Sequence, residues 1–181
     1  MFYNYIGDNM KNKVFIIIVN IVIIALTVLG IILLKNSTES VNYDYEKIMG
    51  KSFVMKDESY IVFNKDKTFI WYKTKDDLED NYYEGTYTVY RGENAIKYIS
   101  NDLSKYAVTE KEQRDLLKRN EDIKIDMYYN LNLVNKKLVM NKEEKMLDYE
   151  RHYYGYSNEE YNYFTLLSMD TANYAYLTLD E

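Results

Sequence analysis

The sequence contains no cysteine and no proline, one histidine and only six glycines among its 181 residues. Without cysteine the chain has no disulfide, no thiol nucleophile, no thiolate metal site and no lipid on an N-terminal cysteine. A single histidine would make any zinc site depend mainly on carboxylates, and the few glycines form no phosphate-binding loop. These absences exclude most of the enzyme classes that a short motif can identify.

Tyrosine is instead abundant, with 22 residues, and 18 asparagines stand against 5 alanines. Codons rich in A and T encode Tyr, Asn, Ile and Lys, so this bias indicates a genome poor in GC. Most of the tyrosines therefore need no special role. Hydrophobic residues make up 47% of the chain and charged residues 29%, a mixture that is typical of a globular protein.

A long apolar run, VFIIIVNIVIIALTVLGIILL, occupies residues 14–34 and contains no charge over 21 positions. As a helix it would extend ~31 Å, which matches the ~30 Å hydrocarbon core of a membrane. It is longer than the apolar segment of a cleaved signal peptide, and no small-residue cleavage pattern follows it. We predict an uncleaved single-pass signal anchor between a short cytoplasmic tail at 1–13 and a polar linker at 35–43.

The charges that flank this span are nearly balanced, so its orientation follows from what must be exported. Only 13 residues precede the span and a long domain follows it, which favours an N-terminus inside the cell and a C-terminal domain outside. Asn20 and Thr27 lie on one helical stripe, and Gly30 would let another helix approach. This face is a candidate helix–helix contact for a homo-oligomer in the membrane. The alternative is that the polar side chains bond only their own helix.

The segment at 36–181 is acidic, with 20 Lys and Arg against 28 Asp and Glu, a net charge of −8. Nucleic acid and anionic lipid need a positive surface, so neither is expected as the main partner. A cationic peptide, a metal ion or a basic protein patch remains compatible with this charge. Solubility alone also explains it.

Hydrophobic periodicity predicts an α+β domain at 44–181, with a mainly antiparallel curved sheet or partial β-barrel and inserted helices. A short helix at 43–49 would end at Gly50, and Thr109 with Glu112 forms a capping box for a later helix. The polar stretch at 74–81 is expected to be a loop and residues 135–137 a turn. The other predicted elements are strands at 52–56, 60–64, 68–73 and 82–90, helices from 94 to 106 and from 109 to near 120, and strands at 123–134, 138–141, 146–154, 161–169 and 174–180.

The alternation of large apolar residues along these strands predicts which side chains fill the core. Tyr83, Gly85, Tyr87 and Val89 are expected to share one face of the fourth strand. The side chains predicted to be buried are Phe63, Phe69, Trp71, Tyr87, Tyr129 and Leu131.

Residues 50–90 carry a pattern of their own: Gly50, a strand, the run IVFNKDKTF at 61–69, another strand, and Gly85-Thr86-Tyr87. This order resembles the lipocalin-like domains of secreted and membrane-attached bacterial proteins. The sequence departs from them at Lys67, where such hairpins usually have glycine, and in placing helices after the fourth strand. The resemblance implies a small β-barrel with a ligand cavity, and it carries over no catalytic residue.

Few residues are candidates for chemistry. His152 lies among charged and aromatic neighbours without a serine-nucleophile motif elsewhere, so we interpret it as a surface or strand-edge residue. The acidic run Asp76, Asp77, Glu79 and Asp80 lacks the spacing and the glycine of a calcium loop and is interpreted as a solvated loop. We therefore predict no catalytic residue, no metal ligand and no cofactor.

Adjacent aromatic residues are the most suggestive feature, because each such pair in a strand supplies one ring to each face of the sheet. One ring can fill the core while the other stacks on a sugar or contacts a peptide; the alternative is core packing combined with codon bias. The candidate ligand or partner contacts are Trp71, Tyr72, Tyr82, Tyr83, Tyr128, Tyr153 and Tyr154.

These observations favour a non-enzymatic, membrane-anchored module of a bacterial cell envelope that binds a protein, peptide or small molecule outside the cell. One alternative is a subunit of a larger membrane assembly, in which the span carries the specificity. Another is an envelope hydrolase that uses carboxylates.

Overall fold

A computed structural model of the chain describes residue 27 and residues 43–180. Among these residues no helix is both long and apolar enough to cross a membrane. The predicted cytoplasmic tail, the span at 14–34 and most of the linker lie outside the described residues, as do Asn20 and Gly30. Thr27 is helical and exposed. The chain divides into two units, and the second, Val41–Glu181, contains every element described below.

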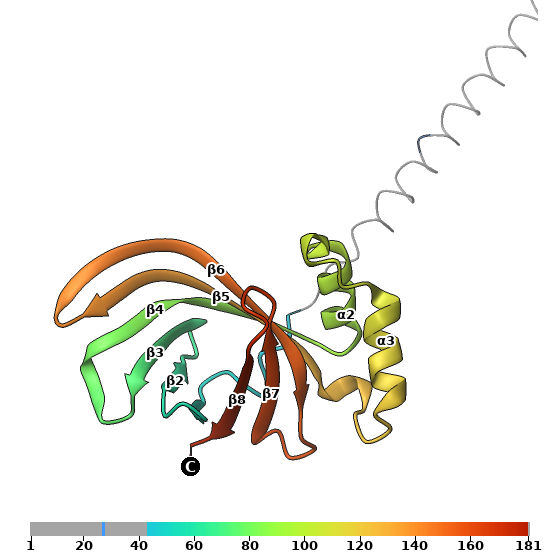
Figure 1. The fold of residues 1–181 in the computed structure, drawn as a ribbon, viewed down its shortest axis with the longest axis horizontal. Helices are drawn as coiled ribbons and strands as arrows, with labels where there is room; N and C mark the ends of the chain where they lie inside the picture. The colour runs from blue at the N-terminus through green and yellow to red at the C-terminus, as the bar shows by residue number, and fades with distance from the viewer. Residues whose placement is uncertain (1–26, 28–42, 181) are drawn as a thin grey trace, which may run out of the picture. The chain divides into compact units, whose positions relative to one another are not determined.

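Eight antiparallel strands form a closed barrel in which each strand pairs with its neighbours in the sequence and β1 pairs with β8 (Figure 1). This architecture fits the lipocalin-like fold that residues 50–90 suggest. The strands are β1 (Ser52–Met55), β2 (Tyr60–Phe63), β3 (Thr68–Thr74), β4 (Asp77–Arg91), β5 (Tyr128–Met140), β6 (Glu143–Ser157), β7 (Tyr163–Ser168) and β8 (Tyr174–Leu179).

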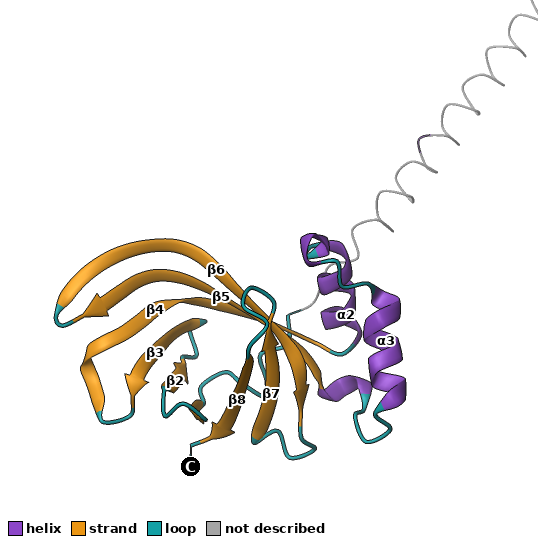
Figure 2. Cartoon of the chain, in the orientation of Figure 1, coloured by secondary structure: helices purple, strands orange, loops and turns teal. Residues whose placement is uncertain are grey.

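Two helices are inserted between β4 and β5, and they lie together at one end of the sheet (Figure 2). They are α2 (Glu93–Asn101) and α3 (Glu110–Arg119), with the short 3-10 helices η1 (Ser104–Tyr106) and η2 (Ile125–Met127) beside them. The predicted capping box is present: the Thr109 hydroxyl accepts from the Glu112 N–H, and the Glu112 carboxylate accepts from the Thr109 N–H.

The barrel interior is filled by apolar side chains from all eight strands, as period-2 alternation predicts. Phe63, Phe69, Tyr87, Tyr129 and Leu131 are buried, which confirms five of the six predicted core positions. Trp71 is only half-buried and packs on the edge of this core. A second core forms outside the barrel, where α2 and its neighbours cover the outer face of β4 and β5 with residues that include Tyr90, Ile96, Ile99 and Tyr128.

The two ends of the barrel differ. At one end Arg91 ties three segments together: its Nε donates to the Asp126 carbonyl at 2.6 Å, and its terminal nitrogens lie 3.3 Å from Asp44 Oδ2 and 3.6 Å from Asp126 Oδ2. Tyr161 also donates to Asp126 Oδ2, at 3.1 Å. These contacts close that end. At the other end β4, β5 and β6 continue past the short strands as an arm, which we define as residues 77–83, 137–140 and 143–148.

The prediction of a loop at 74–81 is wrong. Strand β3 extends to Thr74 and β4 begins at Asp77, with a tight turn between them. The expected turn at 135–137 is also wrong. These residues form a bulge inside one continuous strand, β5, whose register shifts on both sides at this point. Both errors arise in or beside the arm, where polar residues interrupt the hydrophobic alternation on which the prediction of strands depends.

Three smaller expectations also change. The predicted helix at 94–106 ends as α2 at Asn101, and η1 continues after a break. The strand predicted to start at 123 starts at Tyr128, because Ile125–Met127 turns as η2. Residues 45–49 form a single helical turn, in which the Met49 N–H donates to the Tyr45 carbonyl at 2.8 Å, and Gly50 follows at φ +74°.

Candidate functional site

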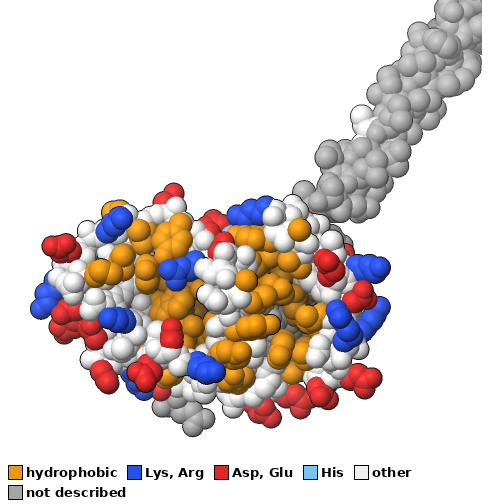
Figure 3. Space-filling view, in the orientation of Figure 1, with side chains coloured by type: hydrophobic (Ala, Val, Ile, Leu, Met, Phe, Trp, Pro, Cys, Tyr) orange, Lys and Arg blue, Asp and Glu red, His pale blue; other side chains and the backbone are white. Residues whose placement is uncertain are grey.

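An open cleft of about 700 Å³ lies between the arm and the open end of the barrel. The space-filling view shows hydrophobic side chains gathered in this hollow, with charged side chains mainly around it (Figure 3). The lining combines aromatic, aliphatic and polar side chains from several strands and two turns. They are Asp57, Ser59, Trp71, Tyr72, Lys73, Thr74, Asn81, Tyr82, Tyr83, Leu138, Val139, Met140, Asn141 and Arg151.

Trp71 lines the cleft and is held there by hydrogen bonds. Its indole Nε1 donates to Ser59 Oγ at 3.0 Å, and Ser59 Oγ donates to Asp57 Oδ1 at 2.7 Å. The Ser59 N–H also donates to Asp57 Oδ1, at 3.1 Å. Because Ser59 is buried and held at both ends, this chain of hydrogen bonds fixes the orientation of the indole ring.

Arg151 projects from β6 into the same cleft. Its guanidinium carbon lies 5.2 Å from the centre of the Trp71 ring, 4.8 Å from that of Tyr83 and 5.3 Å from that of Tyr149. Its Nη2 donates to the Tyr149 hydroxyl at 2.7 Å. The cation is therefore surrounded by the faces of aromatic rings, which attract it through their quadrupoles.

The cleft does not continue into the barrel. Below Trp71 the inward side chains of Leu131, Leu133, Tyr153 and Leu166 pack together and leave a void of only about 10 Å³. A ligand would therefore sit at the mouth of the barrel, with Trp71 and Tyr153 beneath it.

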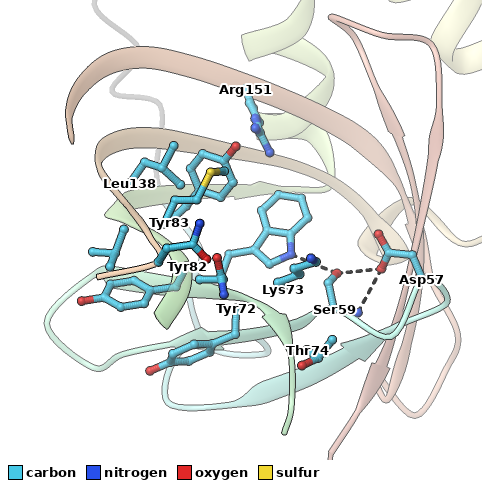
Figure 4. A pocket seen from close by; sticks show the side chains of 14 residues that line it. Asp57, Ser59, Tyr72, Lys73, Thr74, Tyr82, Tyr83, Leu138 and Arg151 are labelled. Atoms are coloured by element: carbon cyan, nitrogen blue, oxygen red, sulfur yellow. Dashed lines mark hydrogen bonds between the residues drawn. The ribbon is translucent and has the colours of Figure 1, made fainter. Parts of the chain in front are cut away.

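The adjacent aromatic pairs divide between the faces of the sheet as alternation predicts. Trp71 and Tyr83 pair across β3 and β4 and face the cleft. Tyr72 and Tyr82 lie at the rim of the cleft and point away from it (Figure 4). Tyr72 and Tyr82 instead contact each other on the outside, with ring centres 5.6 Å apart. Four of the seven predicted contact residues thus lie at one cleft, and two of them face it.

The other three predicted contact residues lie elsewhere. Tyr128 is buried outside the barrel, where its hydroxyl donates to Gln113 Oε1 of α3 at 2.9 Å. Tyr154 is half-buried on the same outer face, with its ring 6.5 Å from that of Tyr128. Tyr153 is buried inside the barrel. Both side chains pack in or against the outer core that includes residues of α2, which explains why Tyr128 and Tyr154 do not face an open surface.

His152 is buried, with 2% of its surface exposed, so its interpretation as a surface or strand-edge residue is wrong. It points outward from β6, a strand paired on both sides, and lies against the Tyr106 ring. Its Nδ1 is 2.8 Å from Asn132 Oδ1, and its Nε2 is 3.3 Å from Glu150 Oε2. Burial lowers the pKa of His152, and the nearby Glu150 opposes that shift only in part. The side chain is therefore neutral, and it lies on the opposite face of the sheet from Arg151.

The acidic run at 76–80 belongs to the β3–β4 turn and to the arm. Asp77 accepts from the Asp80 N–H at 3.0 Å and from the Asn81 amide at 2.7 Å, which holds the pKa of its carboxyl below the usual value. Within the described part of the chain no three His, Cys, Asp or Glu side chains are grouped to hold a metal ion.

The sequence analysis named four of the fourteen residues that line the cleft, and Arg151, Ser59 and Asp57 are among the ten that it missed. The sequence did contain a signal for Arg151. Tyr149, Arg151 and Tyr153 are alternate residues of one strand, so they face the same side of the sheet. That side is the barrel interior, where a charged side chain is unusual. Ser59 and Asp57 lie in the turn before β2, and nothing in their spacing points to a tryptophan twelve residues later.

Comparison of this chain with protein-family models, with curated proteins and with solved structures finds no match. Its function must therefore be argued from the geometry of the cleft and from the sequence.

Proposed function

We propose that this chain is a non-enzymatic binding module, tethered to a bacterial membrane by residues 14–34 and facing the outside of the cell, and that the barrel mouth is its ligand site. The observation that carries the proposal is the open cleft floored by Trp71, Tyr83 and Arg151. A rigid closed barrel holds these side chains, and the pre-formed concave surface of aromatic and polar groups is typical of ligand sites.

The composition of the cleft favours binding over catalysis. Its lining includes one carboxylate, Asp57, whereas the alternative of a carboxylate hydrolase needs two at a defined separation. The single histidine faces away from the cleft, so Ser59 has an aspartate and a tryptophan as partners and no histidine to complete a Ser-His-Asp arrangement. The alternative of a membrane-assembly subunit depends on the N-terminal segment, which lies outside the described residues.

The test uses the fluorescence of Trp71, because this is the only tryptophan in the chain and it lies in the cleft. Full-length protein in a non-ionic detergent is titrated with a panel of small acids, amines, neutral aromatics and sugars. We expect a saturable change in Trp71 emission with at least one class.

Two alanine variants give a matched comparison. Tyr83→Ala removes a ring from the cleft and should weaken the response, whereas Tyr176→Ala removes a ring from β8, outside the cleft lining, and should leave it unchanged. A panel without any saturable response, or equal effects of the two variants, would contradict a ligand site at the barrel mouth.

A further inference from the structure

Arg151 is unusual in its lack of an acidic partner. It is half-buried on the inward face of β6, and no carboxylate of residues 43–180 lies within ion-pair distance of its guanidinium. A guanidinium stays charged at every physiological pH. The positive charge in the cleft is therefore not neutralised by any acidic side chain of the described domain.

The tyrosines around Arg151 do not supply the missing charge. Burial raises the pKa of Tyr149 and of Tyr153, and the nearby Arg151 lowers both only in part. Both hydroxyls are therefore neutral at physiological pH. Tyr149 acts as a hydrogen-bond partner of Arg151, through the 2.7 Å contact of its hydroxyl with Nη2, and neither tyrosine is a counter-charge.

Arg91 provides a contrast within the same barrel. Its side chain also stacks on a tyrosine, with its guanidinium carbon 5.3 Å from the Tyr161 ring, but it has the carboxylates of Asp44 and Asp126 beside it. At the closed end the half-buried cation is thus paired, which is the usual arrangement for a charge removed from water. At the open end the equivalent partner is missing, and the guanidinium is accessible from the cleft.

We infer that the barrel mouth binds a small carboxylate, held by the guanidinium of Arg151, with an apolar or aromatic group packed on Trp71 and Tyr83. This inference rests on the proposed function and names the ligand class of the same cleft. A guanidinium matches a carboxylate through two parallel N–H···O bonds, and the surrounding rings exclude water and strengthen that pairing.

The shape and charge of the cleft limit the ligand further. A single half-buried cation suits a monoanion, since the only other cation of the lining, Lys73, is exposed. The filled interior below Trp71 leaves no room for a long acyl chain. Asp57 does not occupy the position of the anion, because its Oδ1 accepts two hydrogen bonds from Ser59.

The experiment compares three probes of similar shape on the full-length protein, with Trp71 emission as the readout. Phenylacetate carries the carboxylate, phenylacetamide is its neutral counterpart, and phenyl phosphate carries a different anion. We expect saturation with phenylacetate at millimolar concentrations or below, and binding of phenylacetamide at least about tenfold weaker.

Variants assign the effect to one side chain. Arg151→Gln should weaken phenylacetate binding at least about tenfold, and Arg151→Lys should also weaken it, because an ammonium lacks the planar fork. Lys118→Gln removes an exposed cation of α3 and should leave the affinity for phenylacetate unchanged. Thermal unfolding checks that each variant folds. If Arg151→Gln does not fold, the Arg151→Lys variant and the comparison of phenylacetate with phenylacetamide still test the carboxylate inference.

The outcomes separate this inference from the proposed function. Equal binding of acid and amide, or full binding by Arg151→Gln, would overturn the carboxylate inference and leave a ligand site at the barrel mouth. Tighter binding of phenyl phosphate would overturn it in favour of phosphate ligands. No response to any of the three probes would also overturn it, while the wider panel described above continues to test the binding module itself.

Discussion

Trp71 and Phe69 stand two residues apart on β3 and face the same side of the sheet, yet their surroundings differ. Phe69 is fully buried in the barrel, whereas Trp71 is half-buried and forms the floor of the open cleft. Alternation along a strand reports which side a residue faces, but not how far along the barrel axis the packed core extends. The two residues therefore have the same sequence signal and different roles.

This difference predicts the stabilities of two variants. Phe69→Ala should lower the free energy of unfolding by roughly 3–5 kcal/mol, because it leaves a cavity in a closed core. Trp71→Ala should cost less, about 1–3 kcal/mol, since part of the ring already faces water. Chemical denaturation followed by circular dichroism measures both, because Trp71→Ala has no tryptophan to report. Equal losses would mean that the indole belongs to the core.

His152 predicts a pH dependence at the residue scale. Burial lowers its pKa below the ordinary value of 6.5, so the folded protein binds this proton less readily than the unfolded chain. The stability that depends on neutral His152 is therefore present above about pH 6.5 and is lost as the pH falls through the lowered pKa. His152→Gln should show a smaller loss of unfolding free energy between about pH 7 and pH 5 than the wild type.

Glu150 supplies the check on this interpretation. Its carboxylate lies 3.3 Å from His152 Nε2 and favours the protonated ring. Glu150→Gln should lower the pKa of His152 further and make the loss of stability in acid larger than in the wild type. An unchanged pH profile in both variants would show that His152 does not contribute to it.

At the scale of the element, the arm owes its form to irregular positions in three long strands. Register shifts at Gly85, between Asn135 and Lys137, and between Met146 and Tyr149 lie side by side across β4, β5 and β6. A Cβ on Gly85 would lie 1.9 Å from the Val134 carbonyl oxygen, so only glycine allows the strands to approach this closely. The bulges bend the arm over the barrel mouth, which gives the cleft its second wall.

The turn at the tip of this arm predicts a stabilising substitution. Asn141 and Lys142 connect β5 to β6 with φ angles of +51° and +68°, a pair of left-handed residues that favours Asn-Gly. Lys142→Gly should raise the free energy of unfolding by about 0.5–1 kcal/mol. The exposed 3.8 Å contact between Lys142 and Asp80 that would be lost contributes little.

Lys145→Gly is the matched control, because it makes the same change three residues later in β6, where no left-handed angle is needed. There glycine weakens the strand, and the free energy of unfolding should fall by a similar amount. Denaturant titration of both variants measures whether the free energy of unfolding rises in Lys142→Gly and falls in Lys145→Gly. A loss of stability in both would argue against strain at the turn.

At the scale of the whole molecule, the barrel has one closed end and one open end. The segment at 43–50 lies at the closed end. There the Asp44 carboxylate contacts Arg91, and the Asp44 N–H donates to the Val89 carbonyl at 2.9 Å. The chain therefore enters the barrel at the end opposite the cleft.

The proposed location outside the cell predicts the outcome of a protease experiment. Protease added to cells stripped of their wall should digest the domain while the membrane stays intact, because the positions of the span and the long following segment favour export of the C-terminal part. A cytoplasmic marker protein that stays intact is the control. Full protection of the domain would show the reverse orientation.

Local patterns in the sequence determined much of this domain. Period-2 alternation placed most strands, identified five buried core residues and put Trp71 and Tyr83 on the inward face, while the capping box placed the start of α3. Hairpin neighbours in the sequence became neighbours in space, because antiparallel strands joined by short turns pair directly. These features depend on residues only a few positions apart, so the sequence carries them by itself.

Other features arose only from contacts between distant segments. The pairing of Phe53 with Leu179 closes the barrel. The inserted segment, which includes Tyr106, covers His152 from far away in the sequence and buries it on a face that alternation assigns to solvent. The bend of the arm creates the cleft, and barrel closure brings Arg151 against Trp71, eighty residues earlier. The sequence shows that an arginine faces inward, but whether an acidic side chain meets it depends on which strands lie opposite. Only the tertiary structure decides that, since the free energy of a buried charge is set by its neighbours in space.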